Sequence, residues 1–371
     1  MKILLIGNYQ PDQQESMQRF ANMLQAGLAQ LGHEVRLIQP EPFFGKIKLS
    51  ASGLGKWLGY IDKFLLFPSQ LRRAASWADV VHICDHSNAM YTKYLQNVPH
   101  LVTCHDLLAI RSALGEIKEN PTKWTGQQLQ QIILSGLKRS QRVACVSEQT
   151  RTELIRLAKL NPDIVSVIYN GLNHPYAPME KAEVDERLNS LGISSDSPFI
   201  LHVGGNQWYK NRLGVLSIFK CLSQQHNLLD LYLVMAGKPF TNQMHQFIQK
   251  NSLKKQVIEL LAVENEDLRA LYSAATALLF PSLQEGFGWP IAEAQACGCP
   301  VFSSNRAPMT EVGGEAAIYI NSECPEQAAR EIAKNLANVS KLKQAGLINV
   351  QRFTPLRMLE SYIKLYQEIC Q

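Results

Sequence analysis

The sequence from Leu279 to Pro300 reads LFPSLQEGFGWPIAEAQACGCP. Its apolar start predicts a strand that ends near Ser282. Pro290 then stands where the first turn of a helix tolerates proline. Gly298, with Pro300 two residues later, is typical of the end of a helix. The stretch therefore predicts a strand, a glycine-containing loop and a helix.

The loop in this stretch favours binding of an anion next to a sugar. Main-chain amides at a helix N-terminus attract anions, and glycines let a phosphate or sugar approach the chain closely. Glu285 and Glu293 bracket the loop, and their carboxylates can accept hydrogen bonds from sugar hydroxyls. The alternative is a plain turn with two solvated glutamates. The amides concerned belong to Gly286, Phe287 and Gly288.

The same alternation of strand and helix extends through the chain. In the amino half, apolar segments predict strands at 2–7, 35–38, 80–84, 101–104, 142–146 and 165–169. Beyond a linker they predict strands at 199–203, 231–236, 257–262, 277–280 and 300–303. Strands that alternate with helices form parallel sheets covered on both faces. We therefore expect an α/β protein with two doubly wound, Rossmann-like sheets.

The pattern also predicts the domain boundaries. We expect an acceptor-binding domain at 1–172, a donor-binding domain at 173–354 and a terminal helix at 355–371. The apolar spacing of that helix requires one buried face, and crossing back to the amino domain would provide it. Because open parallel sheets bind ligands at the carboxyl ends of their strands, two such sheets favour a site between the domains.

Composition excludes several classes of protein. With 371 residues, 46% apolar and 19% charged, the chain is not disordered, collagen-like or a heptad repeat. Its start lacks the apolar run of a signal peptide or membrane span, and its eight scattered cysteines form no CxxC pair. These features predict a cytoplasmic protein with reduced thiols. Positive charge is concentrated before Gly171, where 19 Lys and Arg face 13 Asp and Glu.

Several motifs give a family resemblance. The pattern Glu285-Gly-Phe-Gly-x-Pro-x-x-Glu293 resembles the E-x7-E signature of the retaining glycosyltransferases of family 4, which have the two-domain GT-B fold. Further segments resemble the family in order and spacing, so that the resemblance extends over essentially the whole chain: 146–150, 168–172, 201–211, 267–275 and 279–282.

The resemblance implies roles in the donor site. Glu293 would bind the nucleotide ribose, Glu285 the transferred sugar and Lys210 the diphosphate, with no metal or cofactor required. Charge that grows on the leaving diphosphate must be met by a fixed cation. In many members an arginine follows the first glycine of the phosphate loop, but here that position is Gly205, so a second cation is missing or supplied elsewhere. Two further donor-site candidates are Asn206 in the phosphate loop and Val263 in the loop that would meet the base.

The amino domain offers fewer transferable residues. His105 matches a family histidine beside the donor sugar, with a packed structural histidine as the alternative. The family is thought to use the donor's own phosphate oxygen as proton acceptor, which leaves positioning and electrostatics to the protein. Its paired glycines after the first strand are absent here, so the acceptor site cannot be carried over. The further candidates on the acceptor side are Gln14, Glu15, Ser16, His86 and Asp106.

Two other features leave alternatives open. His82, Cys84 and His86 alternate along a strand, but zinc needs a fitted set of ligands, so a buried strand with incidental polar residues is preferred. The segment 43–73 carries six basic residues against Asp62, interleaved with apolar ones. It could contact an anionic membrane or a lipid-linked acceptor, or it could pack on the sheet with its lysines solvated.

These observations predict a retaining glycosyltransferase. It would move a hexose of the mannose or glucose type, from GDP-mannose or UDP-glucose, to a sugar or lipid-linked acceptor hydroxyl. Polysaccharide, lipopolysaccharide and glycolipid synthesis are the expected settings, and nucleic acid is not an expected partner. The alternatives are a sugar-nucleotide epimerase and a non-catalytic protein that binds sugar nucleotides.

Overall fold

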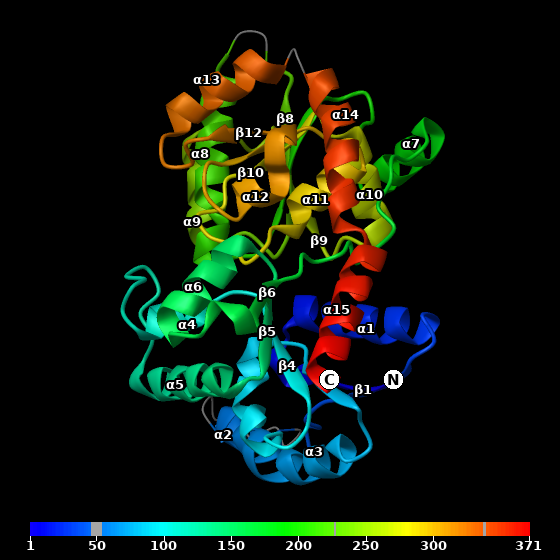
Figure 1. Cartoon of the computed structure of the whole chain (residues 1–371). Helices are drawn as coiled ribbons and strands as arrows, with labels where there is room; N and C mark the ends of the chain where they lie inside the picture. Colours follow the sequence, from blue (N-terminus) through cyan, green and yellow to red (C-terminus); the bar gives the residue numbers. More distant parts are fainter. Residues whose placement is uncertain (46–53, 226–227, 337–338) are drawn as a thin grey trace. The chain divides into compact units, whose positions relative to one another are not determined.

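The computed structural model describes residues 1–45, 54–225, 228–336 and 339–371, and only the backbone of 54–57. The chain forms two compact units (Figure 1). The first comprises Met1–Asn173 and Pro355–Gln371, and the second comprises His174–Thr354. The terminal helix is thus part of the first unit.

The first unit is built on a six-stranded parallel sheet in the order β2-β1-β3-β4-β5-β6. Every residue of β3 and β4 is buried, as expected for central strands that carry helices on both faces. The strands are β1 (Lys2–Ile6), β2 (Glu34–Ile38), β3 (Val80–Ile83), β4 (His100–Cys104), β5 (Arg142–Cys145) and β6 (Val165–Val167).

The helices of this unit follow the predicted alternation. They are α1 (Glu15–Gln30), α2 (Leu54–Ile61), α3 (Phe67–Ala75), α4 (Leu108–Ala113), α5 (Trp124–Arg139), α6 (Glu148–Ala158) and α15 (Pro355–Cys370), and a π turn (Asp62–Leu66) joins α2 to α3. Helix α6 begins where Ser147 Oγ accepts the amide of Thr150 at 3.1 Å, the usual side-chain cap. Helix α1 buries Phe20, Leu24 and Leu28 at helical spacing.

Helix α15 packs beside α1 and against β3 (Figure 1). An ideal Cβ at Gly27 would lie only 2.4 Å from Leu359, so glycine permits this close approach of the two helices. Below the helix, His82 binds the hydroxyls of Tyr366 and Thr103 with its two ring nitrogens, each at 2.7 Å. The face predicted to be buried therefore packs on the sheet of the first unit.

The second unit has its own parallel sheet, in the order β12-β11-β10-β7-β8-β9. The strands are β7 (Phe199–Gly204), β8 (Tyr232–Gly237), β9 (Val257–Leu261), β10 (Ala277–Phe280), β11 (Val301–Ser304) and β12 (Ala317–Ile320). The prediction of two doubly wound sheets is confirmed. It lacked only β12, which lies at the edge of the sheet.

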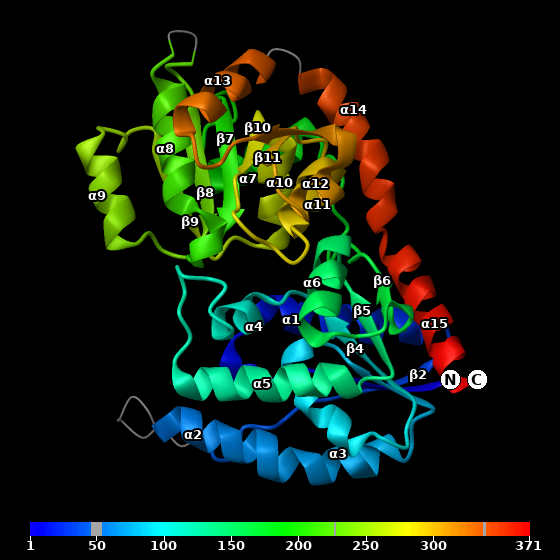
Figure 2. The ribbon, with the colours of Figure 1, turned by 60° about the vertical axis from the view of Figure 1, so that its left-hand side comes forward.

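Helices cover this sheet as well, and α8 and α13 lie side by side (Figure 2). The helices are α7 (Lys181–Ser190), α8 (Arg212–Ser223), α9 (Asn242–Lys250), α10 (Asn265–Ala274), α11 (Trp289–Ala296), α12 (Met309–Gly313), α13 (Pro325–Leu336) and α14 (Val339–Asn349). In the described parts of both units, no helix has the length and apolar character needed to cross a membrane.

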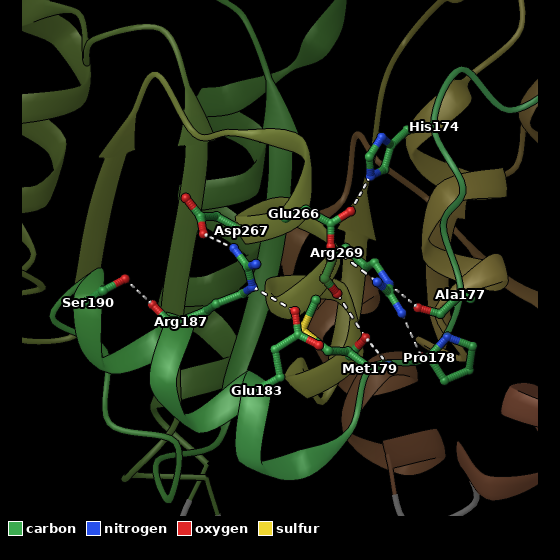
Figure 3. Close-up of polar contacts among 11 residues, drawn as sticks. His174, Ala177, Pro178, Met179, Glu183, Arg187, Ser190, Glu266, Asp267 and Arg269 are labelled. Carbon is green, nitrogen blue, oxygen red and sulfur yellow. Dashed lines mark hydrogen bonds and ion pairs between the residues drawn. The ribbon is translucent and has the colours of Figure 1, made fainter.

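The polar face of α10 holds the segment that opens the second unit (Figure 3). Arg269 donates to the carbonyl oxygens of Ala177 at 2.9 Å and Pro178 at 3.2 Å. One helical turn earlier, Glu266 binds His174 at 2.5 Å. These contacts fix α10, and α10 in turn carries a residue of the candidate site.

Candidate active site

The candidate donor site lies where the order of strands in the second sheet reverses. Strands β7 and β10 are neighbours there, and the chain leaves them toward opposite sides of the sheet. Such a switch point opens a crevice at the carboxyl ends of the strands. The loops that follow β7 and β10 are joined by a hydrogen bond from the Leu283 amide to the Tyr209 carbonyl at 2.7 Å.

Lys210 and Glu285 meet at this point. The Lys210 ammonium lies 2.8 Å from one carboxylate oxygen of Glu285 and 3.0 Å from the other. Both side chains are largely buried, with 17% and 8% of their surfaces exposed. The ammonium also lies 5.4 Å from the ring centre of Phe280, within the range of a cation–π contact. The structure thus joins two residues that are 75 positions apart in the sequence.

Glu293 lies on α11, which begins after Gly288. This glycine has φ of 102°, a conformation that side chains rarely adopt, so it allows the sharp entry into the helix. Glu293 is buried, and the hydroxyl of Tyr272 on α10 donates to it at 2.9 Å. Burial, together with the nearby Glu293 charge, raises the pKa of Tyr272 well above its usual value. Sequence reasoning did not identify Tyr272, although its motif was noted.

The remaining donor-site candidates occupy the surrounding loops. Asn206 donates to the Pro239 carbonyl at 2.7 Å. Val263 is half-buried between β9 and α10. The ring of Phe287 is buried edge-on against Phe353, so this side chain packs in the core rather than lining the site. Gly286 precedes it in the β10–α11 loop, and Gly205 begins the turn toward Asn206.

Arg212 is a cation that sequence reasoning missed. It is 5% exposed, and its Nη1 donates to the carbonyl of Lys238 at 2.8 Å and to the side chain of Asn206. Its Nε and Nη2 have no hydrogen-bond partner among the described residues. Burial lowers the pKa of Arg212, partly offset by the charge of Glu259. A buried guanidinium without a bound carboxylate is costly for the free protein, so it suggests an anionic ligand nearby.

The first unit has a polar cluster at its own switch point, between β1 and β3. Asn8, after β1, donates to Asp85, after β3, at 2.5 Å. Asp85 also accepts the amide of Ser87 at 3.2 Å. Burial raises the pKa of Asp85, but its contacts with His86 and Ser87 outweigh this and hold the pKa well below the usual range. Asp85 is therefore a buried carboxylate, which sequence reasoning missed.

Two predicted histidines adjoin this carboxylate. His86 Nδ1 lies 3.0 Å from Asp85, and although burial lowers its pKa, the charge of Asp85 raises it overall. His105 Nε2 donates to the Cys84 carbonyl at 2.9 Å, and burial lowers its pKa. His105 also packs edge-on against Phe20 with ring centres 4.7 Å apart. One histidine therefore favours the charged form and the other the neutral form.

The other acceptor candidates have local roles in the structure. Asp106 accepts the amide of Leu108 at 3.0 Å at the start of α4. Gln14 accepts a hydrogen bond from Asn8 just before α1, and Glu15 and Ser16 are exposed in the first turn of that helix. In the described ranges, no group of three or more His, Cys, Asp or Glu residues could hold a metal ion.

The structure describes part of the basic segment 43–73. Lys46 and Lys48 lie outside the described residues, as does the side chain of Lys56. Asp62 is buried and accepts the hydroxyl of Tyr9 at 2.8 Å. Lys63 lies 2.5 Å from Asp12. The contact with a membrane or lipid-linked acceptor stays a prediction.

Two family models match the chain. One, described as glycosyl transferases group 1, matches residues 183–349, and the other, described as glycosyltransferase family 4, matches residues 17–174. The chain belongs to glycosyltransferase family 4. The family resemblance and the GT-B fold predicted from the sequence are thus confirmed.

The relatives of this glycosyltransferase differ in what they act on. It is 24% identical over 317 residues to O-antigen chain mannosyltransferase B of Escherichia coli. The matched region covers 82% of this chain and 81% of the relative. Its fold is similar to sucrose-phosphate synthase from Thermosynechococcus elongatus, with a TM-score of 0.77, 18% identity and coverage of 100% and 99%. It is also similar to Anabaena Alr3699/HepE in complex with UDP and glucose, with a TM-score of 0.76, 16% identity and coverage of 99% and 100%.

Proposed function

We propose that this glycosyltransferase transfers a hexose from a nucleotide-diphosphate sugar to an acceptor hydroxyl with retention of the anomeric configuration. The observation that carries the proposal is the largely buried pair of Lys210 and Glu285 at the switch point of the second unit. Mannose or glucose is the proposed sugar, because the relatives include a mannosyltransferase and a protein in complex with UDP and glucose.

In this proposal, three residues bind different parts of the donor. Lys210 balances the charge that develops on the diphosphate as the sugar leaves, a role that requires a cation held in place beforehand. Glu285 accepts hydrogen bonds from hydroxyls of the sugar. Glu293, oriented by Tyr272, accepts hydrogen bonds from the ribose.

Arg212 provides the second cation of this site. Its free N–H groups are buried, so it acts through its charge rather than by touching the phosphate. The Asn206 side chain connects it to the phosphate loop. With two cations available, we propose that transfer proceeds without a metal ion, and its rate should be unchanged by a chelator.

The first unit positions the acceptor in this proposal. His105, held by the Cys84 carbonyl, is neutral and can bind a sugar hydroxyl without adding charge. Water is a competing acceptor, so transfer depends on how well the site positions a sugar hydroxyl.

The test measures binding first and transfer second. Purified protein is titrated with UDP, GDP and ADP by calorimetry, and the preferred base selects the nucleotide sugars for assay with simple glycosides. The anomeric configuration of the product is then read by NMR. Binding and transfer with a retained anomer support the proposal. An inverted product overturns retention, and donor epimerisation or binding without any turnover overturns the transferase assignment.

A further inference from the structure

A polar cavity lies in the first unit, and its lining includes none of the residues to which the resemblance assigns a role. It has a volume of about 370 Å³ and lies between α1, the end of β2 and α3. This volume falls within the range of about 300–1,000 Å³ that is typical of small-molecule sites. The described residues around it all belong to the first unit.

Carboxamides dominate the wall of this cavity. Gln18, Asn22 and Gln25 project from one face of α1, since positions three, four and seven apart share a side of a helix. Gln39 follows β2 on the opposite side. None of these four side chains forms a hydrogen bond to a described residue, so their donors and acceptors are available to a ligand.

The floor of the cavity is apolar. Leu37 of β2 and Ala21 of α1 contribute to it. An ideal Cβ at Gly7 would lie 3.3 Å from both Gln39 Oε1 and Leu37, so the glycine leaves room for these two side chains beside the cavity. An apolar floor with a rim of amides suits a ring that has C–H groups on one face and hydroxyls at its edge.

The charges in the wall select against anionic ligands. The lining residues include no Lys, Arg or His, and their one ionisable side chain is Glu41. A carboxylate can accept hydrogen bonds from hydroxyls but repels a phosphate. The wall therefore matches a neutral polyhydroxyl ligand and not a sugar phosphate.

The cavity adjoins the polar cluster at the switch point of this unit. Asn8 lines the cavity and also donates to Asp85, which lies beside His86. Asn88 donates to Asn8 at 3.0 Å and fixes the orientation of its amide. A ligand in the cavity therefore lies next to residues at the carboxyl edge of the same sheet.

We propose that this cavity binds a neutral sugar residue of the acceptor. The inference rests on the proposed function in assuming that the acceptor is a saccharide, and it adds that the bound residue is uncharged. It also moves the acceptor site from Gln14, Glu15 and Ser16, at the start of α1, to residues further along the helix.

The first experiment measures binding of methyl glycosides to the protein saturated with the preferred nucleotide. Saturation-transfer NMR with methyl α-mannoside, methyl α-glucoside and methyl α-galactoside is compared with glucose 6-phosphate and inositol phosphate. We expect at least one neutral glycoside to bind and the phosphates to bind more weakly. Stronger binding of the phosphates, or no binding of any neutral glycoside, would overturn the proposal.

Variants then locate the binding. The double variant Gln18→Leu with Gln25→Leu keeps good helix formers and removes two amides, so glycoside affinity should fall about tenfold. Gln30→Leu, at the exposed end of α1, is the matched control and should bind as the wild type does. Unchanged affinity in the double variant would place the sugar elsewhere.

Hydrolysis of the donor without an acceptor separates the two proposals. If the double variant hydrolyses donor at the wild-type rate but binds glycosides weakly, both the transferase site and the cavity are supported. If the wild type neither binds nor hydrolyses a nucleotide sugar, the proposed function fails independently of this cavity. If hydrolysis is normal and the glycoside data are negative, only the cavity proposal fails.

Discussion

The Lys210 ammonium contacts both carboxylate oxygens of Glu285, at 2.8 and 3.0 Å. In the ligand-free protein each residue therefore neutralises the group that the other would offer to the donor. In the proposed mechanism a diphosphate shares Lys210 with Glu285, so removing either residue would change the charge that the diphosphate meets.

This sharing predicts opposite effects of two variants on nucleotide binding. Lys210→Gln removes the cation and should weaken binding of the nucleotide diphosphate. Glu285→Gln frees the cation and should leave that binding equal or several-fold tighter. Both variants should lower kcat/KM by about 100-fold or more, because each loses a group that stabilises the transition state. Calorimetry and steady-state kinetics provide the two measurements.

The double variant Lys210→Gln with Glu285→Gln tests whether these two residues act together in catalysis. The effects of substituting residues in direct contact are not additive. The fold-loss of kcat/KM in the double variant should therefore be smaller than the product of the two single fold-losses. Normal turnover by Glu285→Gln would remove Glu285 from the mechanism, and weaker nucleotide binding by that variant would contradict the shared cation.

Arg212 should affect the binding of the diphosphate but not the binding of the base. We expect Arg212→Gln to weaken binding of the nucleoside diphosphate by about tenfold, since one charge at partial screening contributes about 1–2 kcal/mol. Binding of the nucleoside alone should change little. Arg212→Lys, which keeps the charge, should recover part of the loss.

The control for this variant is Lys220→Gln, further along α8. Calorimetric titrations of the four proteins with nucleoside and nucleoside diphosphate give the comparison. Equal losses for both ligands would mean that Arg212 only holds the loops of Asn206 and Lys238 in place.

Tyr272 should act through Glu293. Tyr272→Phe removes the hydrogen bond of 2.9 Å and leaves the buried carboxylate less well oriented. A less well oriented Glu293 loses part of its hydrogen bond to the ribose, and because such a bond contributes about 1.5–3 kcal/mol, nucleotide affinity should fall by about tenfold. The preference for a ribonucleotide over its 2′,3′-dideoxy analogue should narrow at the same time. An unchanged preference would show that Glu293 does not bind the ribose.

The sequence predicted most of this architecture because its signals are local. Strand β10, the loop at Glu285 and helix α11 each depend on neighbouring residues, such as Pro290 at the helix start. The helical spacing of apolar residues in α15 likewise predicted that one of its faces is buried. Strand β12, at the edge of the second sheet with Ile318 and Tyr319 only half-buried, was not predicted.

Long-range contacts explain what was not predicted. Asn8 and Asp85 meet only because β1 and β3 are neighbours, although 77 residues separate them. Arg212 looks like an ordinary helix residue until its burial and its two unbonded nitrogens are known. His82 lies on β3, two residues before Cys84, but Tyr366 and Thr103 occupy its ring nitrogens, which a spacing pattern cannot reveal.

Acid should destabilise the second unit through His202. Its Nδ1 lies 3.0 Å from the Leu279 carbonyl and so carries the proton, while Nε2 has no hydrogen-bond partner among the described residues. Burial, reinforced by the charges of Arg212 and Lys210, lowers the pKa of His202 to about 3. Because an unfolded histidine titrates near pH 6.5, the stability from the neutral ring is complete above about pH 6.5 and is lost progressively as the pH falls toward 3.

The free energy of unfolding should therefore fall by about 2 kcal/mol between pH 7 and pH 5 from this residue alone. In His202→Gln the folded protein no longer excludes that proton, so the same pH change should cost about 2 kcal/mol less. Urea unfolding of the ligand-free protein at both values of pH measures the difference, with His245→Gln on the exposed face of α9 as control. An equal pH dependence in wild type and His202→Gln would mean that His202 does not remain neutral in the folded protein.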